Sequence, residues 1–256
     1  MSTVTVEELK AKYPYMYEPH MHTKEASACA RSSGREMARA HKEAGYAGII
    51  VTDHNWGGNT CVDRSLEWTE WVDKFFEGYR EAKDEGDKIG LQVFPGWEAG
   101  YGGPEFLIYG LTPQWLMEHP EIKNASVKEQ YDMVHEAGGL VIQAHPFRED
   151  WYLHSIELFP HEVDGCEIVN ATHSNHLSQS HNNPVFDDEA ILYAKVHGFM
   201  TTCGSDVHSV NLFGGGMAFP TKLESIEDFI DRIKNGGDYV LSNGDHWYSK
   251  TGELLV

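Results

Sequence analysis

One unit recurs along the chain: a short apolar run, a turn that carries a histidine or an acidic residue, and then a helical pattern. Residues 47–52, 140–144 and 165–170 are examples of the apolar runs. Largely apolar runs of this length are typical of strands that are covered on both faces, as in parallel sheets. The alternation of such strands with helices predicts an α/β fold.

The side chains at the ends of these strands favour a barrel over an open sheet. We expect seven or eight strands within residues 1–256, with no internal linker and no low-complexity segment, and therefore a single domain. Candidate ligands come from many strands and must converge, which a closed or distorted (β/α) barrel allows. In such barrels the functional site forms at the C-terminal rim of the strands.

Local signals place several helices and one long loop. In a capping box, a Ser or Thr side chain and a Glu three residues later satisfy each other's backbone N–H groups. This pattern predicts helix starts at Thr5, Ser33 and Ser126. Apolar periodicity predicts one long helix over about 65–86. Residues 147–163 form a long polar and aromatic loop, which is the best candidate for a lid over a substrate.

The net charge of the chain indicates which kinds of ligand it can bind. The formal net charge is −20, with 40 acidic against 20 basic residues. Such a surface repels phosphate backbones, so we expect no binding of long nucleic acids. A local pocket could still bind a small anion if metal ions supply positive charge there.

Neither a targeting segment nor a membrane span is expected. The N-terminus has no basic region followed by an apolar core, and no apolar run is long enough to cross a bilayer. The four cysteines lie far apart, which indicates reduced thiols rather than a disulfide framework. We therefore expect a cytoplasmic protein without a membrane partner, and the oligomeric state stays open.

Five strand ends carry side chains that can bind metal ions. The first is a His-x-His pair, in which alternate residues of a strand point to the same face, so both imidazoles aim at one point. Imidazole and carboxylate groups bind zinc, iron and manganese. Helix caps or ordinary loop positions would explain single cases but not the series, so we expect most of these residues to bind metal together. They are His20, His22, His54, Glu98, His145, Asp206 and His208.

As a set, the motifs around these residues resemble the successive motifs of the PHP (polymerase and histidinol phosphatase) family. The resemblance runs from about Glu18 to His208. It implies a distorted (β/α)₇ barrel with two or three divalent ions, of zinc, manganese or iron, that hydrolyses phosphate esters. The motifs are His20-x-His22, Thr52-Asp53-His54, Gly96-x-Glu98, Ala144-His145-Pro146 and Gly204-Ser205-Asp206-x-His208.

The same resemblance implies how the ligands are shared among the ions. Glu98 would bridge the first two ions. The first ion would take His20, His22, Glu98 and Asp206, the second Glu98 and His145, and the third His54 and His208.

Two positions depart from the family pattern. Members often carry a His or Asp some six residues after the second histidine of the first motif, where this chain has Ala28 and Cys29. A His is also common near the start of the strand after Glu98, where this chain has Glu105. Glu25 and Glu105 could substitute as oxygen ligands, although the alternative for Glu25 is a plain surface carboxylate. These departures leave open whether a third ion binds. Oxygen ligands at these positions would favour a harder ion such as manganese.

Phosphate ester hydrolysis explains why metals are needed. A phosphate monoester is a dianion that repels hydroxide, and divalent cations neutralise it and lower the pKa of a bound water. We expect attack on phosphorus by a metal-bridging hydroxide, with no covalent enzyme intermediate. Asp206 or His208 could assist as base and His145 as acid, and the sequence does not rank them. Arg148 could contact a substrate phosphate or be an ordinary surface arginine.

The sequence therefore favours a phosphoesterase that acts on a small phosphorylated metabolite or a nucleotide. An exonuclease-like phosphodiesterase acting on short oligonucleotides is the first alternative. A non-catalytic metal-binding or regulatory barrel is the second. An amidohydrolase-like enzyme is the third, but such enzymes usually add a metal-bridging lysine, which we cannot locate in this sequence.

Overall fold

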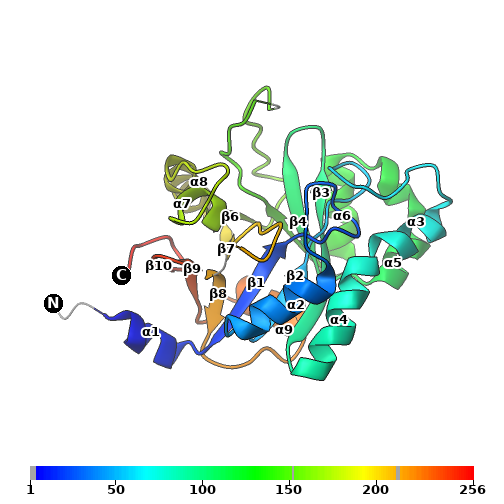
Figure 1. Ribbon diagram of the computed structural model, residues 1–256. Helices are drawn as coiled ribbons and strands as arrows, with labels where there is room; N and C mark the ends of the chain where they lie inside the picture. Colours follow the sequence, from blue (N-terminus) through cyan, green and yellow to red (C-terminus); the bar gives the residue numbers. More distant parts are fainter. Residues whose placement is uncertain (1–3, 152, 212–213) are drawn as a thin grey trace.

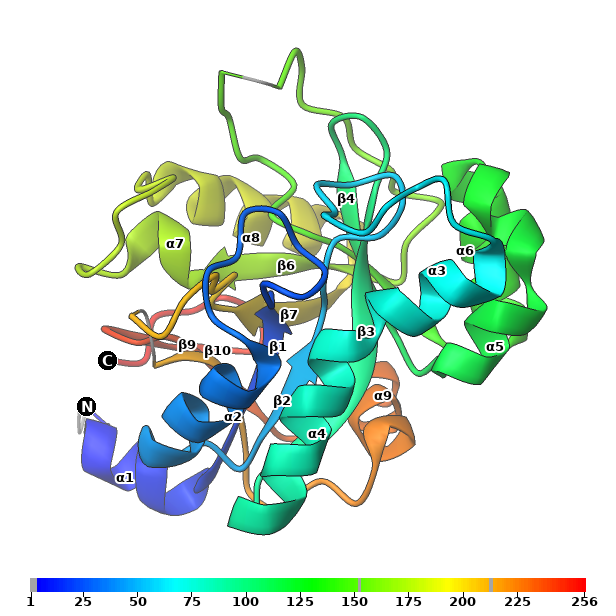
Figure 2. The same cartoon turned by 45° about the vertical axis from the view of Figure 1, so that its right-hand side comes forward.

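The computed structural model describes residues 4–151, 153–211 and 214–256. Its centre is one curled sheet, and Figures 1 and 2 show helices around the outside of the curl. The strands are β1 Tyr15–Met21, β2 Gly48–Val51, β3 Gln92–Gly100, β4 Glu105–Tyr109, β5 Leu140–Gln143, β6 Gly165–Asn170, β7 Met200–Gly204, β8 Gly215–Phe219, β9 Val240–Asn243 and β10 Trp247–Ser249. Within the described residues their order across the sheet is β10-β9-β8-β1-β2-β3-β4-β5-β6-β7.

The sheet is mixed, so the expectation of an α/β fold is confirmed but the count of seven βα units is not. β1, β2 and β3 are parallel, as are β5, β6 and β7. β4 runs antiparallel to both β3 and β5, because the chain turns straight back after β3 without a helix. β8, β9 and β10 are also antiparallel to their neighbours. Just beyond β7, Val207 bridges Met21 of β1, so the sheet curls into a half-barrel.

The helices are short and amphipathic, and three begin at the predicted capping boxes of Thr5, Ser33 and Ser126. Among the described residues, no helix is both long enough and apolar enough to cross a bilayer. Their bounds are α1 Val6–Lys12, α2 Gly34–Glu43, α3 Trp68–Phe75, α4 Glu77–Ile89, α5 Pro113–Glu118, α6 Val127–Glu136, α7 Ala171–Ser174, α8 Val185–His197 and α9 Ile226–Lys234, with a 3₁₀ turn, η1, at Pro120–Asn124.

The prediction of one long helix over 65–86 is wrong. The segment forms α3 and α4, which meet at Phe76. Phe75 and Phe76 are both buried, at 2% exposure each. The backbone departs from regular helix geometry at Phe76, with φ −87° and ψ 13°, and this residue separates the two helices. The long loop predicted at 147–163 is present, and its residue 152 lies outside the described residues.

Strand periodicity separates the apolar core from the charged centre. Met21, Ile49 and Val51 of β1 and β2 pack with Met37 and Ala38 of α2 on the outer face of the sheet. Successive side chains of a strand point to opposite faces, so the neighbours of Met21 point into the curl. Figure 2 shows the loops after β1, β2 and β5 gathered at one end, beside the β3–β4 hairpin.

Candidate metal centre

The side chains predicted from the strand ends converge at the C-terminal end of the parallel strands. His20 and His22 are fully buried, and so is Glu98. His145 and Asp206 have φ angles of 27° and 51°. L-residues rarely occupy this left-handed region, and such strained positions cluster at functional sites. The ends of β1, β2, β3, β5 and β7 thus contribute to one cluster, as the sequence predicts.

Glu98 lies at the middle of this cluster and contacts four imidazoles. Its Oε1 lies 3.3 Å from Nε2 of His20 and 3.1 Å from Nε2 of His145. Its Oε2 lies 2.9 Å from Nδ1 of His54 and 3.5 Å from Nε2 of His22. Burial raises the pKa of Glu98, but His20 and His54 lower it, and the net pKa falls well below the usual value. Glu98 is therefore an anion whose two oxygens face different groups of nitrogen atoms.

Asp206 contacts the first histidine pair on one side and an arginine on the other. Its Oδ1 lies 3.1 Å from Nε2 of His22 and 3.4 Å from Nε2 of His20. Its Oδ2 accepts from the Arg148 guanidinium at 2.7 Å. Arg148 is buried and also donates to Thr172 Oγ1 at 3.0 Å. Arg148, which the sequence left open between a substrate contact and a surface arginine, therefore holds a carboxylate of the cluster.

Glu105 joins the cluster from the antiparallel strand. The β3–β4 register pairs Glu105 with Gly100, which lies two residues after Glu98, so both carboxylates share one face. Glu105 lies 3.4 Å from Nδ1 of His54 and 3.6 Å from Nε2 of His145. Burial and the charge of Glu98 raise its pKa.

Glu25, the other proposed oxygen ligand, lies apart from the cluster. Its half-buried carboxylate accepts from the backbone N–H of Gly34 at 3.1 Å, in the first turn of α2. A carboxylate at a helix N-terminus is stabilised by the unpaired N–H groups there. Glu25 thus has a local structural role, and we leave it out of the centre.

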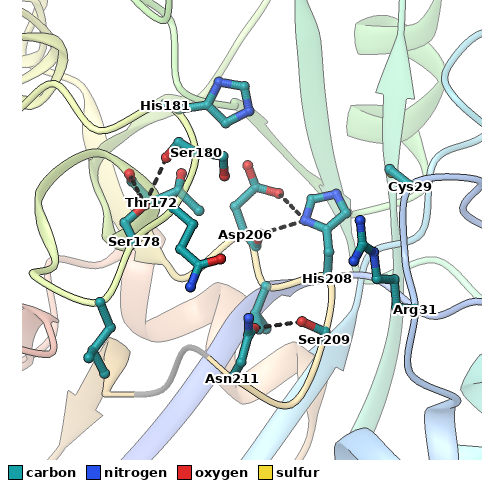
Figure 3. Close-up of a pocket in the computed structure, with 13 residues that line it drawn as sticks. Cys29, Arg31, Thr172, Ser178, Ser180, His181, Asp206, His208, Ser209 and Asn211 are labelled. Carbon is teal, nitrogen blue, oxygen red and sulfur yellow. Dashed lines mark hydrogen bonds and ion pairs between the residues drawn. The ribbon is translucent and has the colours of Figure 1, made fainter.

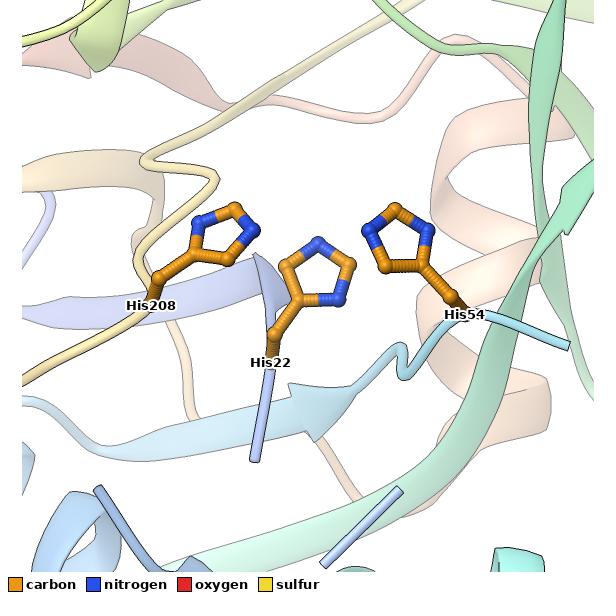
Figure 4. Close-up of side chains that lie close together, drawn as sticks. All are labelled: His22, His54 and His208. Atoms are coloured by element: carbon orange, nitrogen blue, oxygen red, sulfur yellow. The ribbon is translucent and has the colours of Figure 1, made fainter. Parts of the chain in front are cut away.

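A second group of histidines lies beside Glu98. The ring of His22 stacks on the rings of His54 and His208, with 4.4 Å between centroids in each case (Figure 4). Nδ1 of His208 bonds the backbone carbonyl of Asp206 at 2.8 Å, which fixes the orientation of the ring.

The donor atoms suit divalent metal ions. Buried Nε2 of His20, Nδ1 of His54 and Oε2 of Glu98 lie 2.9–3.5 Å from other donor atoms of the cluster, yet in the described residues they form no hydrogen bond. Buried polar atoms are usually paired, and coordination to a cation would pair them. In four groups the donor atoms lie within 4.8 Å of one another. These are His22, His54 and His208; His20, His22 and Glu98; His20, His145 and Asp206; and His54, Glu98 and Glu105.

The sequence analysis missed the buried polar residues behind these ligands. Glu167 of β6 accepts from His20 Nδ1 at 2.9 Å and from the backbone N–H of His145 at 3.2 Å. Asp53 accepts from the Oγ atoms of Thr23 and Ser27, each at 2.6 Å. Burial raises the pKa of Asp53 to about 6. An acidic residue inside the apolar run 165–170 was the available signal for Glu167, because such a group is buried only with partners.

A cavity of about 380 Å³ lies over the cluster. Its lining includes Glu98, Arg148 and Asp206 from below, and Asn59 and His181 from the surrounding loops. A second pocket of about 270 Å³ shares part of this lining (Figure 3). The size and the mixed polar lining suit a small molecule.

Behind Arg148, an Asp–His pair predicts a pH dependence of stability. His173 accepts from Arg148 at 3.0 Å, and its Nδ1 lies 2.8 Å from Asp187. Burial raises the pKa of Asp187 from 3.8 to about 8. Between these values the native state keeps a proton that the unfolded state has lost, so the free energy of unfolding falls as pH rises. One proton changes it by at most about 1.4 kcal/mol per pH unit.

We therefore expect Asp187→Asn to flatten the decline in Tm between pH 5 and 7.5, as measured by circular dichroism. The matched control is Asp188→Asn, on the exposed side of the same helix, which should keep the wild-type slope. Equal slopes for the wild type and Asp187→Asn would show that Asp187 is ionised throughout this range.

Comparison with known proteins identifies solved structures that have a similar fold. No protein-family model and no curated protein matches the sequence. A two-domain protein from Bacteroides vulgatus, described as containing a PHP-like metal-dependent phosphoesterase, matches with a TM-score of 0.68 and 13% identity. The match covers 92% of this chain but 66% of that one, just under two thirds of its length.

Two further solved structures match less closely. PsfC from Pseudomonas syringae has a TM-score of 0.55 and 15% identity, over 84% of this chain and 87% of that one. A candidate metal-dependent phosphoesterase from Bifidobacterium adolescentis has a TM-score of 0.51 and 15% identity, over 88% and 97%. At these identities the likeness concerns the fold, and it confirms the resemblance to PHP-like proteins at that level.

Proposed function

We propose that this chain is a metal-dependent phosphoesterase that hydrolyses a small phosphorylated metabolite or a nucleotide. The observation that carries the proposal is Glu98, whose two oxygens contact four imidazoles supplied by three separate segments. A carboxylate in this position is well placed to bridge two cations, with one oxygen bound to each. The likeness of the fold to proteins described as metal-dependent phosphoesterases supports the same class.

The proposed ligands follow the contacts in the cluster. The first ion would be held by His20, His22, Glu98 and Asp206, the second by Glu98, Glu105 and His145, and the third by His54 and His208. When bound, the ions would neutralise the phosphate dianion and make a water molecule more acidic. This positive charge is what allows an acidic chain of net charge −20 to bind a phosphate.

The residues around the ligands would position the reaction. Arg148 neutralises one oxygen of Asp206 and so leaves the other oxygen directed at His20 and His22. His208 lines the cavity, and we propose that it exchanges a proton with the substrate when the third ion is absent. Asp206 is paired with Arg148 and His145 with Glu98, which favours ligand roles for both over proton transfer.

Metal removal and reloading test the proposal. The protein is stripped with a chelator, reloaded with Zn²⁺, Mn²⁺ or Fe²⁺, and assayed with p-nitrophenyl phosphate. We expect activity to disappear on stripping, to return with at least one of these ions, and to be lost in His22→Ala and Asp206→Ala. A panel of mononucleotides, sugar phosphates, histidinol phosphate and short oligonucleotides then identifies the substrate class.

The same substrate panel, extended to diesters and anilides, distinguishes the alternative functions. Preference for bis(p-nitrophenyl) phosphate and oligonucleotides would support a phosphodiesterase, and hydrolysis of anilides would support an amidohydrolase. A protein that binds these ions but is inert towards every phosphate ester would overturn the catalytic proposal and leave a metal-binding barrel.

A further inference from the structure

Trp151 is the most exposed large apolar side chain of the described residues, with 91% of its surface accessible. It lies in the loop after β5, and Figure 1 shows this loop projecting beyond the sheet at the end that holds the metal centre. A single exposed apolar residue needs no explanation by itself. Trp151, however, also lines the cavity of about 380 Å³ over the metal centre. The indole is therefore open to solvent at a place that a bound substrate would occupy.

Contacts of Asp150 hold the turn that carries this indole. The backbone N–H of Trp151 donates to Oδ1 of Asp150 at 2.6 Å, and that of Leu153 donates to the Asp150 carbonyl at 3.0 Å. Oδ2 of Asp150 lies 3.0 Å from Nδ1 of His181, in the loop between α7 and α8. His181 lines the same cavity and has a φ of 54°, the kind of strained position that clusters at functional sites. Two loops thus meet above the metal centre, with Trp151 beside their contact.

The rest of the lining offers few groups to the organic part of a substrate. Most of the lining residues are proposed metal ligands, and Arg148 is paired with Asp206. Among the lining residues that the structure describes, the largest side chain outside the metal centre is that of Trp151. Sugar hydroxyls that enter a site without finding partners are costly, whereas a planar ring needs only a flat aromatic surface. The cavity therefore suits an aromatic leaving group better than a hydroxyl-rich one.

We propose that Trp151 stacks on a heteroaromatic base in the leaving group, so that the enzyme prefers mononucleotides to sugar phosphates. The inference rests on the proposed function and narrows its substrate class. Every base has a π face, so stacking selects nucleotides as a class without selecting one base. Stacking also needs no positive charge from a chain whose net charge is −20.

A matched pair of esters tests this specificity. AMP and ribose 5-phosphate share the phosphate and the sugar, and only AMP carries a base. With the metal-reloaded, full-length protein we expect kcat/KM to be higher for AMP on the order of 5–100-fold, the usual effect of stacking one base on an aromatic side chain. Trp151→Ala should remove this advantage mainly through KM and leave ribose 5-phosphate nearly unchanged. Trp151→Phe should keep most of it.

The matched control is Ile156→Ala, on the same loop. Ile156 is also exposed, at 39%, but lies outside the lining of this cavity, so its truncation should change neither ester. Replacing Trp151 removes no buried contact, so the variants should fold as the wild type does. Equal kcat/KM for the two esters in the wild type would overturn the proposal. An equal loss for both esters in Trp151→Ala would overturn it too, because the indole would then pack on the sugar or act only on the loop.

Fluorescence gives a readout that does not need turnover. A phosphonate analogue of AMP, in which carbon replaces the bridging oxygen, binds without being hydrolysed. The chain has seven tryptophans, so the difference between the wild type and Trp151→Phe isolates the signal of Trp151. We expect the analogue to quench this signal and the corresponding ribose phosphonate to leave it unchanged. Quenching that is the same in the wild type and in Trp151→Phe would overturn the proposal.

The outcomes also separate this inference from the proposed function. Hydrolysis of AMP and ribose 5-phosphate with equal kcat/KM would refute the stacking and leave the phosphoesterase intact. Quenching of Trp151 in a protein inert towards every phosphate ester would confirm the stacking and refute the phosphoesterase. Neither hydrolysis nor quenching would refute both.

Discussion

Replacing Glu98 with Gln is expected to lower kcat/KM for a phosphomonoester by at least about 1,000-fold. Metal-ion stabilisation of a phosphoryl transition state is worth several kcal/mol, and each 1.36 kcal/mol is a factor of ten. The amide keeps the shape of the side chain but cannot bridge two cations with two anionic oxygens. Metal analysis should show fewer bound ions per chain than in the wild type.

The matched control for this change is Glu85→Gln. Glu85 is also buried, at 4% exposure, but it lies on α4 and pairs with Arg39 at 2.6 Å, outside the metal centre. We expect Glu85→Gln to reduce thermal stability without changing kcat/KM. If Glu98→Gln keeps near wild-type turnover while its circular dichroism spectrum is native, Glu98 does not bridge the catalytic ions.

The ligands at strand ends could be predicted because their signal is local. An apolar run followed at once by a histidine or carboxylate marks the rim of the sheet, and His54 and His145 are both found there. The His-x-His pair needed only the two-residue period of a strand. Glu105 was harder, because its place depends on the β3–β4 register that pairs it with Gly100.

Other features depended on contacts between distant segments. The break between α3 and α4 lies at one residue, Phe76, and the helical periodicity of the buried side chains continues across it and so does not reveal it. The sequence left Arg148 open between a phosphate contact and an ordinary surface arginine, and tertiary folding buries it against Asp206. The prediction that all core strands are parallel was wrong at β4. Only four residues join β3 to β4, and they form a hairpin instead of a helical crossover.

Replacing Glu167 with Gln is expected to weaken metal binding on the order of 10–100-fold, the usual effect of removing a carboxylate that holds a ligating histidine. Glu167 accepts from Nδ1 of His20, which leaves Nε2 of that ring directed at Glu98 and Asp206. The ring would keep its place in the variant but lose an anion that makes it a better donor. Isothermal titration with Zn²⁺ and Mn²⁺ measures the change, and Glu85→Gln again serves as the matched control.

The pH dependence distinguishes this role from simple loss of stability. In the metal-free protein burial lowers the pKa of His20, but the charges of Glu167, Asp206 and Glu98 raise it well above the usual value. Protons therefore compete with metal for His20 in the wild type, and removing the charge of Glu167 lowers this pKa and weakens the competition. The deficit in metal affinity of Glu167→Gln should thus be smaller at acidic pH than at alkaline pH. A deficit that is equal at all pH values, or an affinity equal to that of the wild type, would show that Glu167 does not act through His20.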